Sequence, residues 1–228
     1  MSAVAIITAR GGSKRIPRKN IRNFLGKPII GYAIETALRS SLFDEVMVST
    51  DDDEIASIAQ SMGAVVPFRR SAATSNDSAT TLDVLLEVLA AYDARGVSFD
   101  YGCCIYPVTP LLTSELLGRA YDKLREGSLD SVYPVQRFAF PIQRAFYLRN
   151  DRLGWLHPEH ALTRSQDFEA AYHDAGQFYW FNVPAFRRSG KLLTDCTGCV
   201  EVSELQAQDI DNEADWQMAE LKYRLLHP

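Results

Sequence analysis

The sequence has no apolar run long enough to span a membrane, and its N-terminus lacks the charged-then-apolar pattern of an export signal. We therefore expect a cytoplasmic protein. It also lacks an excess of basic residues, because 24 Lys and Arg stand against 29 Asp and Glu, giving a net charge of −5. General nucleic-acid binding requires an extended basic surface, so this balance argues against it.

Cysteine is scarce, with four residues in a chain of 228. Cys196 and Cys199 have zinc-knuckle spacing, whereas Cys103 and Cys104 are adjacent and would point to opposite faces of a strand. We expect buried, reduced thiols. A structural zinc or a redox pair at Cys196 and Cys199 is the alternative, which bound zinc or a thiol titration would support.

Both standard nucleotide fingerprints are missing. Gly-Gly-Ser-Lys lacks the first glycine of a P-loop, and no Gly-x-Gly-x-x-Gly follows the first predicted strand. The pattern His157-Pro-Glu-His160 is not the His-Glu-x-x-His of a zinc helix, and we interpret both histidines as structural.

The stretch from Val4 to Asn20 is the most informative part of the chain. Its first residues, 4–9, are apolar and rich in β-branched side chains, which predicts a strand buried on both faces of a parallel sheet. In the loop that follows, Gly11 and Gly12 would let the backbone turn and direct amide groups at an anion. The loop is basic through Arg10, Lys14, Arg15, Arg18, Lys19 and Arg22. At the end of a first strand this pattern predicts a site for a polyphosphate-sized anion, with a solvated charged loop as the alternative.

Strand and helix signals alternate through the first half of the chain. We predict strands at 45–49, 64–68, 101–106 and 130–135. We also predict four helices: one with Pro28 in its first turn, one that follows Asp53, and two that cover 80–94 and 113–126. This order predicts an α/β fold with a mainly parallel sheet and helices on both faces. Asp51 to Asp53 could hold a metal, but we interpret them as the N-cap of a helix that ends near Gly63.

Two later segments carry polar groups with a possible role. After an irregular, aromatic-rich insertion at about 137–172, which favours a partner surface, a strand over 172–181 would place Gln177 and Tyr179 on one face, where they could line a sugar pocket. Asp209 and Asp211 flank Ile210 just before a helix predicted at 213–226. Their carboxylates would project to one side, which suits Mg²⁺, while Ile210 enters the core. Asp211 as the N-cap of that helix is the equal alternative.

The segment Ala9 to Asn20 resembles the N-terminal signature of the CMP-sialic acid synthetases, cytidylyltransferases that activate nonulosonic acids. Three further landmarks follow in the family's order: the segment 70–77, the turn 106–111, and Asp209-Ile-Asp211. Thr8 replaces a usual proline and Tyr106 a usual glutamine. Arg15, Tyr106 and the segment 175–180 are more similar to the pseudaminic acid branch of the family.

This resemblance implies one Rossmann-like nucleotidyltransferase domain over residues 1–228, with an inserted arm that crosses to a second subunit of a homodimer. It implies transfer of CMP from CTP to a nonulosonic acid, with pseudaminic acid preferred and N-acetylneuraminic or legionaminic acid next. A catalytically silent nucleotide-binding protein is a remote alternative, which an absence of CTP-dependent pyrophosphate release would favour.

The resemblance also implies a set of site residues. Those implied for CTP are Arg10, Gly11, Gly12, Ser13, Lys14, Lys19, Asn20, Arg70, Asp77 and Thr80, and those for the sugar are Tyr106, Arg164, Gln177 and Tyr179. Catalysis is expected to depend on Arg10, Lys19, Asp209 and Asp211, the last two holding Mg²⁺. The prediction requires the basic loop and the two aspartates to converge on one triphosphate.

Overall fold

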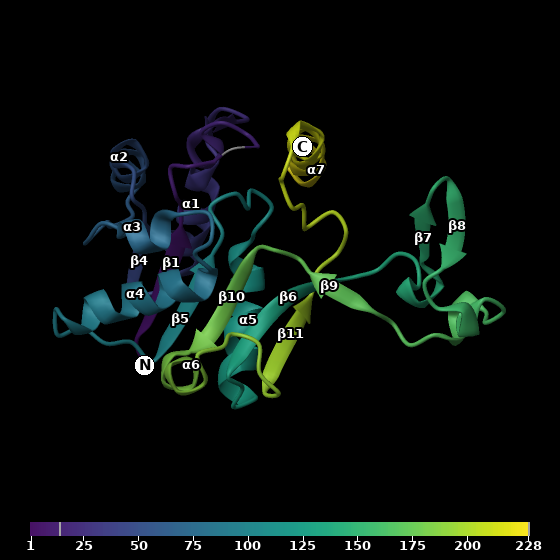
Figure 1. Cartoon of the computed structure of the whole chain (residues 1–228). Helices are drawn as coiled ribbons and strands as arrows, with labels where there is room; N and C mark the ends of the chain where they lie inside the picture. Colours follow the sequence, from purple (N-terminus) through teal and green to yellow (C-terminus); the bar gives the residue numbers. More distant parts are fainter. Residues whose placement is uncertain (14, 228) are drawn as a thin grey trace.

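A seven-stranded sheet forms the centre of the protein (Figure 1), whose computed structural model describes residues 1–13 and 15–227. The strand order is β11-β6-β10-β5-β1-β4, with β9 beside β6. β1 pairs in parallel with β4 and β5, and β11 with β6, whereas β9 and β10 run antiparallel to their neighbours. The predicted mainly parallel sheet is therefore confirmed. Its strands are β1 (Ala3–Thr8), β4 (Glu45–Ser49), β5 (Tyr101–Ile105), β6 (Ser131–Arg137), β9 (Tyr172–Asp174), β10 (Phe178–Asn182) and β11 (Thr197–Glu201).

Helices cover both faces of this sheet. Successive apolar side chains of β1 point to opposite faces, so both faces must be covered. Ile7 faces a core shared with α1, α2 and α5, and Ile6 faces a second core shared with α4 and α6. Cys103 and Cys104 enter these opposite cores, as predicted. The helices are α1 (Ile30–Ser40), α2 (Asp53–Ser61), α3 (Ala72–Ser75), α4 (Thr81–Asp93), α5 (Ser114–Glu126) and α6 (Val183–Ser189).

A third apolar cluster joins the two ends of the chain. Ile16 and Phe24, from the segment after β1, pack with Ile210 and with Trp216 of α7 (Glu213–Leu226). The rings of Phe24 and Trp216 lie 5.5 Å apart between centroids. This packing places α7 beside the loop that follows β1 (Figure 1).

Several sequence predictions require correction. Pro28 lies in the hairpin formed by β2 (Asn23–Phe24) and β3 (Lys27–Pro28), before α1 begins. The strand predicted at 64–68 is reduced to one bridge between Val65 and Met47, because Pro67 has no N–H to continue the ladder. Cys196 and Cys199 are exposed, contrary to the expected burial, because they lie at the edge strand β11.

The aromatic-rich segment after β6 forms an arm that projects away from the sheet (Figure 1). It carries the hairpin of β7 (Phe146–Arg149) and β8 (Arg152–Trp155) and the short turns η2 (Ile142–Arg144), η3 (Pro158–His160) and η4 (Ser165–Asp167). Every residue of β7 is exposed. In the part of the chain that the structure describes, no helix is long and apolar enough to cross a bilayer.

Candidate active site

A cleft of about 460 Å³ lies at the carboxyl ends of β1 and β5, and we call it the central cleft. Ligands of open α/β sheets bind at this edge. Four segments far apart in the sequence supply its walls: the loop after β1, the turn after β5, Gly176 before β10, and the segment before α7. The lining residues are Thr8, Arg10, Ser13, Arg15, Lys19, Asn20, Tyr106, Pro107, Val108, Gly176, Asp209 and Ile210.

Lys19 connects the basic loop to the acidic segment. Its Nζ donates to the carbonyl oxygen of Ile210 at 2.6 Å and lies 3.8 Å from Oδ1 of Asp211. Nη1 of Arg15 lies 2.6 Å from Oδ2 of Asp211. Burial lowers the pKa of Lys19, and burial together with the charge of Asp211 raises the pKa of Asp209. The predicted convergence of the two regions is confirmed.

The carboxylate of Asp211 is not used to cap α7. Asn212 is the N-cap, accepting from the backbone N–H groups of Ala214 and Asp215, so the capping alternative for Asp211 is wrong. Two further contacts hold this segment in place: Arg22 donates twice to Glu213, at 2.7 Å each. The carboxylate of Asp211 is thereby directed at the basic loop.

The pair Asp209 and Asp211 fits a magnesium site. Ile210 between them is 2% exposed, as the alternation predicted. Among residues 1–13 and 15–227 no group of three or more His, Cys, Asp or Glu is placed to hold a metal. Mg²⁺ is bound through one or two carboxylates together with water and phosphate oxygens, so two aspartates beside the predicted phosphate site could hold it.

At Gly11 the backbone N–H of the basic loop is not directed at an anion as predicted. The N–H of Gly11 donates to Oδ1 of Asp51 at 3.0 Å. Neither Gly11 nor Gly12 has a positive φ; among the described residues of the loop, 9–13 and 15–18, the left-handed one is Arg18, with φ of 54°. Lys14, predicted to bind phosphate, lies outside the described residues. Of the predicted anion donors in the described part of the loop, the side chains of Arg10, Ser13 and Lys19 line the central cleft.

A smaller pocket of about 200 Å³ shares Thr8 and Arg10 with the central cleft, and we call it the adjacent pocket. It brings together the predicted residues Arg70, Asp77 and Thr80. Nη1 of Arg10 donates to Oδ1 of Asp77 at 2.7 Å. Arg70 is buried and donates to the carbonyl oxygen of Ser49 at 2.7 Å, and burial lowers its pKa.

A third cavity, of about 390 Å³, shares Tyr106 with the central cleft and Thr80 with the adjacent pocket; we call it the tyrosine pocket. The hydroxyl of Tyr179 donates to Oδ2 of Asp174 at 2.6 Å. Burial raises the pKa of Tyr106 and of Tyr179. The wall of the tyrosine pocket also includes Tyr133, Lys191, Leu192 and Leu193.

Sequence reasoning missed several residues of the tyrosine pocket. Asp174 lies in the segment 172–181, which the sequence analysis noted for its polar groups. Its position two residues before Gly176 was the signal in the sequence that could have indicated it. Lys191 follows α6 without any local pattern that indicates a site.

Two residues predicted to contact the sugar, Gln177 and Arg164, line none of the three cavities described above. Gln177 is 2% exposed, and its Nε2 donates to the carbonyl oxygen of Gln206 at 2.5 Å. It precedes β10 at a break marked by Gly176, with φ of 64°, so the strand alternation does not govern it. Arg164 is on the arm, with its side chain 73% exposed and paired with Asp167.

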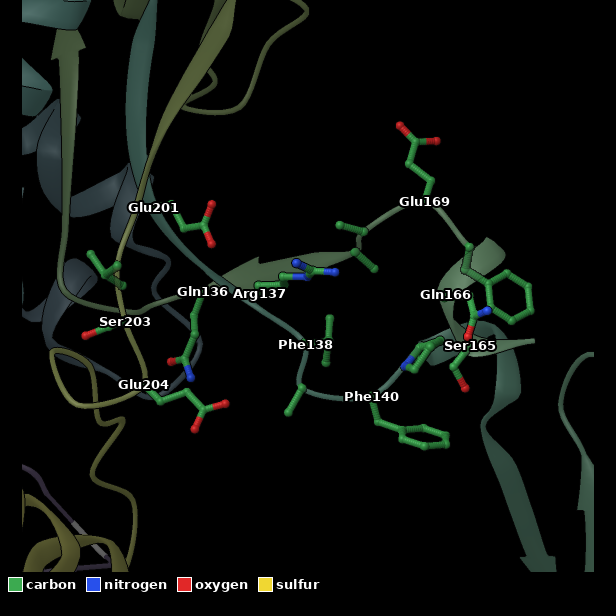
Figure 2. A pocket seen from close by; sticks show the side chains of 16 residues that line it. Gln136, Arg137, Phe138, Phe140, Ser165, Gln166, Glu169, Glu201, Ser203 and Glu204 are labelled. Atoms are coloured by element: carbon green, nitrogen blue, oxygen red, sulfur yellow. The ribbon is translucent and has the colours of Figure 1, made fainter. Parts of the chain in front are cut away.

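The arm meets the body at a further pocket of about 480 Å³. Figure 2 shows Gln136, Glu201 and Ser203 on the side of the sheet, and Ser165 and Gln166 on the side of the arm. The residues that line this pocket include none of the predicted site residues.

The central cleft, the adjacent pocket and the tyrosine pocket share lining residues and adjoin one another. The family description cytidylyltransferase matches residues 4–187, and the chain belongs to this family. The family resemblance seen in the sequence is thus confirmed.

Relatives extend this result over the whole chain. It is 39% identical over 228 residues to the pseudaminic acid cytidylyltransferase of Campylobacter jejuni, covering 100% of this chain and 98% of the relative. It is 33% identical over 220 residues to N-acylneuraminate cytidylyltransferase A of Danio rerio, covering 95% of this chain and 49% of the relative. A solved structure of CMP:2-keto-3-deoxy-manno-octonic acid synthetase complexed with CTP has the same fold, with a TM-score of 0.72, 18% identity and coverage of 99% and 100%.

Proposed function

We propose that the protein transfers CMP from CTP to the anomeric hydroxyl of pseudaminic acid and releases pyrophosphate. The C2 hydroxyl oxygen forms a bond to the α-phosphorus, the bond from that phosphorus to the pyrophosphate oxygen breaks with its electron pair left on pyrophosphate, and the hydroxyl proton passes to water. The observation that carries this proposal is the meeting of the basic loop with Asp209 and Asp211 at one cleft. The whole-chain similarity to a pseudaminic acid cytidylyltransferase supports the choice of acceptor.

Side chains of the basic loop would hold the triphosphate. Arg10, Ser13, Lys19 and Asn20 line the central cleft and supply cationic and hydrogen-bonding groups. Lys14, assigned the same role from the sequence, would add a further charge. Phosphoryl transfer requires little covalent chemistry from a protein, so catalysis would come from positioning and charge neutralisation.

Asp209 and Asp211 would hold Mg²⁺ next to the triphosphate. When bound, the ion neutralises phosphate charge and lowers the effective pKa of the attacking hydroxyl. In the free chain Arg15 and Lys19 balance the charge of Asp211. Arg15 and Lys19 would therefore lie next to the phosphates of a triphosphate bound in the central cleft.

The other two cavities would take the nucleoside and the sugar. Arg70, Asp77 and Thr80 in the adjacent pocket would contact cytosine and ribose. Tyr106 and Tyr179 in the tyrosine pocket would contact the acceptor.

The arm would complete the sugar site of a second subunit in a homodimer. Phe140 is 60% exposed and Leu162 is 99% exposed, which is apolar surface that a partner would cover. The guanidinium of Arg164 would bind the carboxylate of a sugar acid held in the partner subunit, through two parallel hydrogen bonds.

Mixing two inactive variants tests this exchange of arms. Arg164→Ala supplies an intact Asp209, and Asp209→Asn supplies an intact arm, so a mixed dimer contains one complete site if arms cross. Turnover restored on mixing is expected. Continued inactivity of the mixture, with dimers verified by light scattering, would place Arg164 in the site of its own subunit, whereas an active Arg164→Ala variant would place Arg164 outside the site.

The proposed activity is tested by pyrophosphate release from CTP with a panel of sugar acids. We expect the highest kcat/KM with pseudaminic acid, and dependence on added Mg²⁺ after treatment with a chelator. N-acetylneuraminic acid is the second candidate, because the Danio rerio relative is named for N-acylneuraminate. Preference for N-acetylneuraminic or legionaminic acid would correct the acceptor, and no release with any acid would reject the function.

A further inference from the structure

The loop after β1 is held at both ends by the acidic turn that follows β4. At its start the N–H of Gly11 donates to Asp51. Near its end Arg18 donates to Oδ2 and Oδ1 of Asp52 at 2.5 and 3.2 Å, and it also pairs with Glu54. We propose that Asp51, Asp52 and Arg18 form a clasp that positions the triphosphate-binding loop. The inference rests on the proposed function and assigns these three as positioning residues.

A loop of this composition needs such a clasp. Arg10, Arg15 and Lys19 line one cleft, where Asp77 and Asp211 balance part of their charge, and the repulsion that remains opposes a compact arrangement before an anion arrives. Arg18 adopts the left-handed conformation, which is unfavourable for a residue with a Cβ. Its two hydrogen bonds to a carboxylate offset this cost and direct its charge away from the cleft.

Asp52 is itself fixed by a rigid element. It caps α2, accepting from the N–H of Ile55 at 2.9 Å. The hydrogen bond from Arg18 holds the pKa of Asp52 below its usual value, so the carboxylate is charged at neutral pH. The helix end therefore gives the loop a fixed anchor, as precise positioning of a binding site requires.

Gly11 shows how closely the loop approaches this anchor. A Cβ at Gly11 would lie 2.8 Å from Oδ2 of Asp52, whereas a Cβ at Gly12 would meet nothing within 4 Å. At the base of the loop, Nδ2 of the buried Asn20 donates to the carbonyl oxygen of Arg10 at 2.9 Å. The clasp and this bond together leave the cationic side chains facing the central cleft.

Three variants separate the clasp from a general effect of charge. Arg18→Ala removes one partner. Asp52→Asn removes the ion pair but keeps a good N-cap for α2. Asp53→Asn is the matched control, because Asp53 stands beside Asp52 on the same helix end but pairs with Arg69, at 2.6 Å.

Calorimetric titration with CTP and Mg²⁺ measures the effect on the triphosphate site. We expect a Kd about tenfold higher for Arg18→Ala and for Asp52→Asn, and little further loss in the double variant, because the two residues act as one pair. The KM for the sugar acid should not change. Arg18→Lys should recover part of the affinity, since an ammonium keeps the charge without the double hydrogen bond. Asp53→Asn should bind CTP as the wild type does.

Amide hydrogen exchange of the free protein gives a second readout that needs no ligand. Exchange at the amides of residues 11–13, 15, 16, 18 and 19 should be faster in Arg18→Ala and Asp52→Asn than in the wild type and Asp53→Asn. Unchanged CTP affinity and unchanged exchange in Arg18→Ala would overturn the clasp, as would an equal loss in Asp53→Asn. If Arg18→Ala does not fold, Arg18→Lys and Asp52→Asn decide by the same criteria. A wild-type protein that binds no CTP rejects the proposed function, while exchange still decides the clasp.

Discussion

Replacing Lys19 by Met should weaken both stability and CTP binding, because this side chain joins the two halves of the site. Its Nζ donates to the carbonyl of Ile210 at 2.6 Å, and its side chain is 21% exposed. A hydrogen bond to a charged group contributes about 1.5–3 kcal/mol, and water can reach the carbonyl at the cleft, so we expect a loss of about 1.5 kcal/mol. This corresponds to a fall of roughly 4 °C in Tm for a chain of this size.

The same ammonium would bind a phosphate, so its removal should raise the Kd for CTP by about 10- to 100-fold. Calorimetry and thermal unfolding measure the two effects. Lys27→Met is the control, since Lys27 also pairs with a carboxylate, Glu35 at 2.6 Å, and lies over the Tyr32 ring. It should lower Tm to a similar extent and leave CTP binding intact. Unchanged CTP affinity in Lys19→Met would refute the reasoning.

Three further predictions concern the same region. Asp209→Asn should lower kcat by about a hundredfold or more with Tm nearly unchanged, and turnover near that of the wild type would remove the metal role. Gly11→Ala should weaken CTP binding and stability because its Cβ would crowd Asp52, whereas Gly12→Ala has open space; equal effects in both assays would contradict this. In urea unfolding at a series of pH values, Asp52→Asn should flatten the loss of stability in acid. Arg18 depresses the folded-state pKa of Asp52, so their pairing stabilises fully above about pH 4 and is lost as pH falls through that lower pKa; parallel curves for the two proteins would exclude it.

Local signals predicted most helices and strands well. The final helix has the predicted bounds, Glu213–Leu226, and α4 (Thr81–Asp93) begins one residue after its predicted start. Caps and apolar periodicity act over a few residues, so one sequence is enough to reveal them. The strand predicted at 64–68 was wrong for a local reason, because Pro67 inside it has no N–H to continue the pairing of Val65 beside β4.

The site was predicted in its parts and not in its geometry. The order of the motifs along the chain and the family resemblance identified Lys19, Asp209 and Asp211. The contact between Lys19 and Ile210, however, spans 191 positions. It depends on the packing of Phe24 against Trp216, which no local pattern indicates. Gln177 was misplaced for a similar reason, since the break before β10 follows from tertiary hydrogen bonding to Gln206.

A crystal structure with CTP and Mn²⁺ in place of Mg²⁺ tests the central claim most directly. The account predicts an anomalous peak for the ion at Asp209 and Asp211, with the triphosphate against Arg10, Ser13 and Lys19 in the central cleft. A triphosphate bound in another cavity, or an ion bound away from both aspartates, would contradict it.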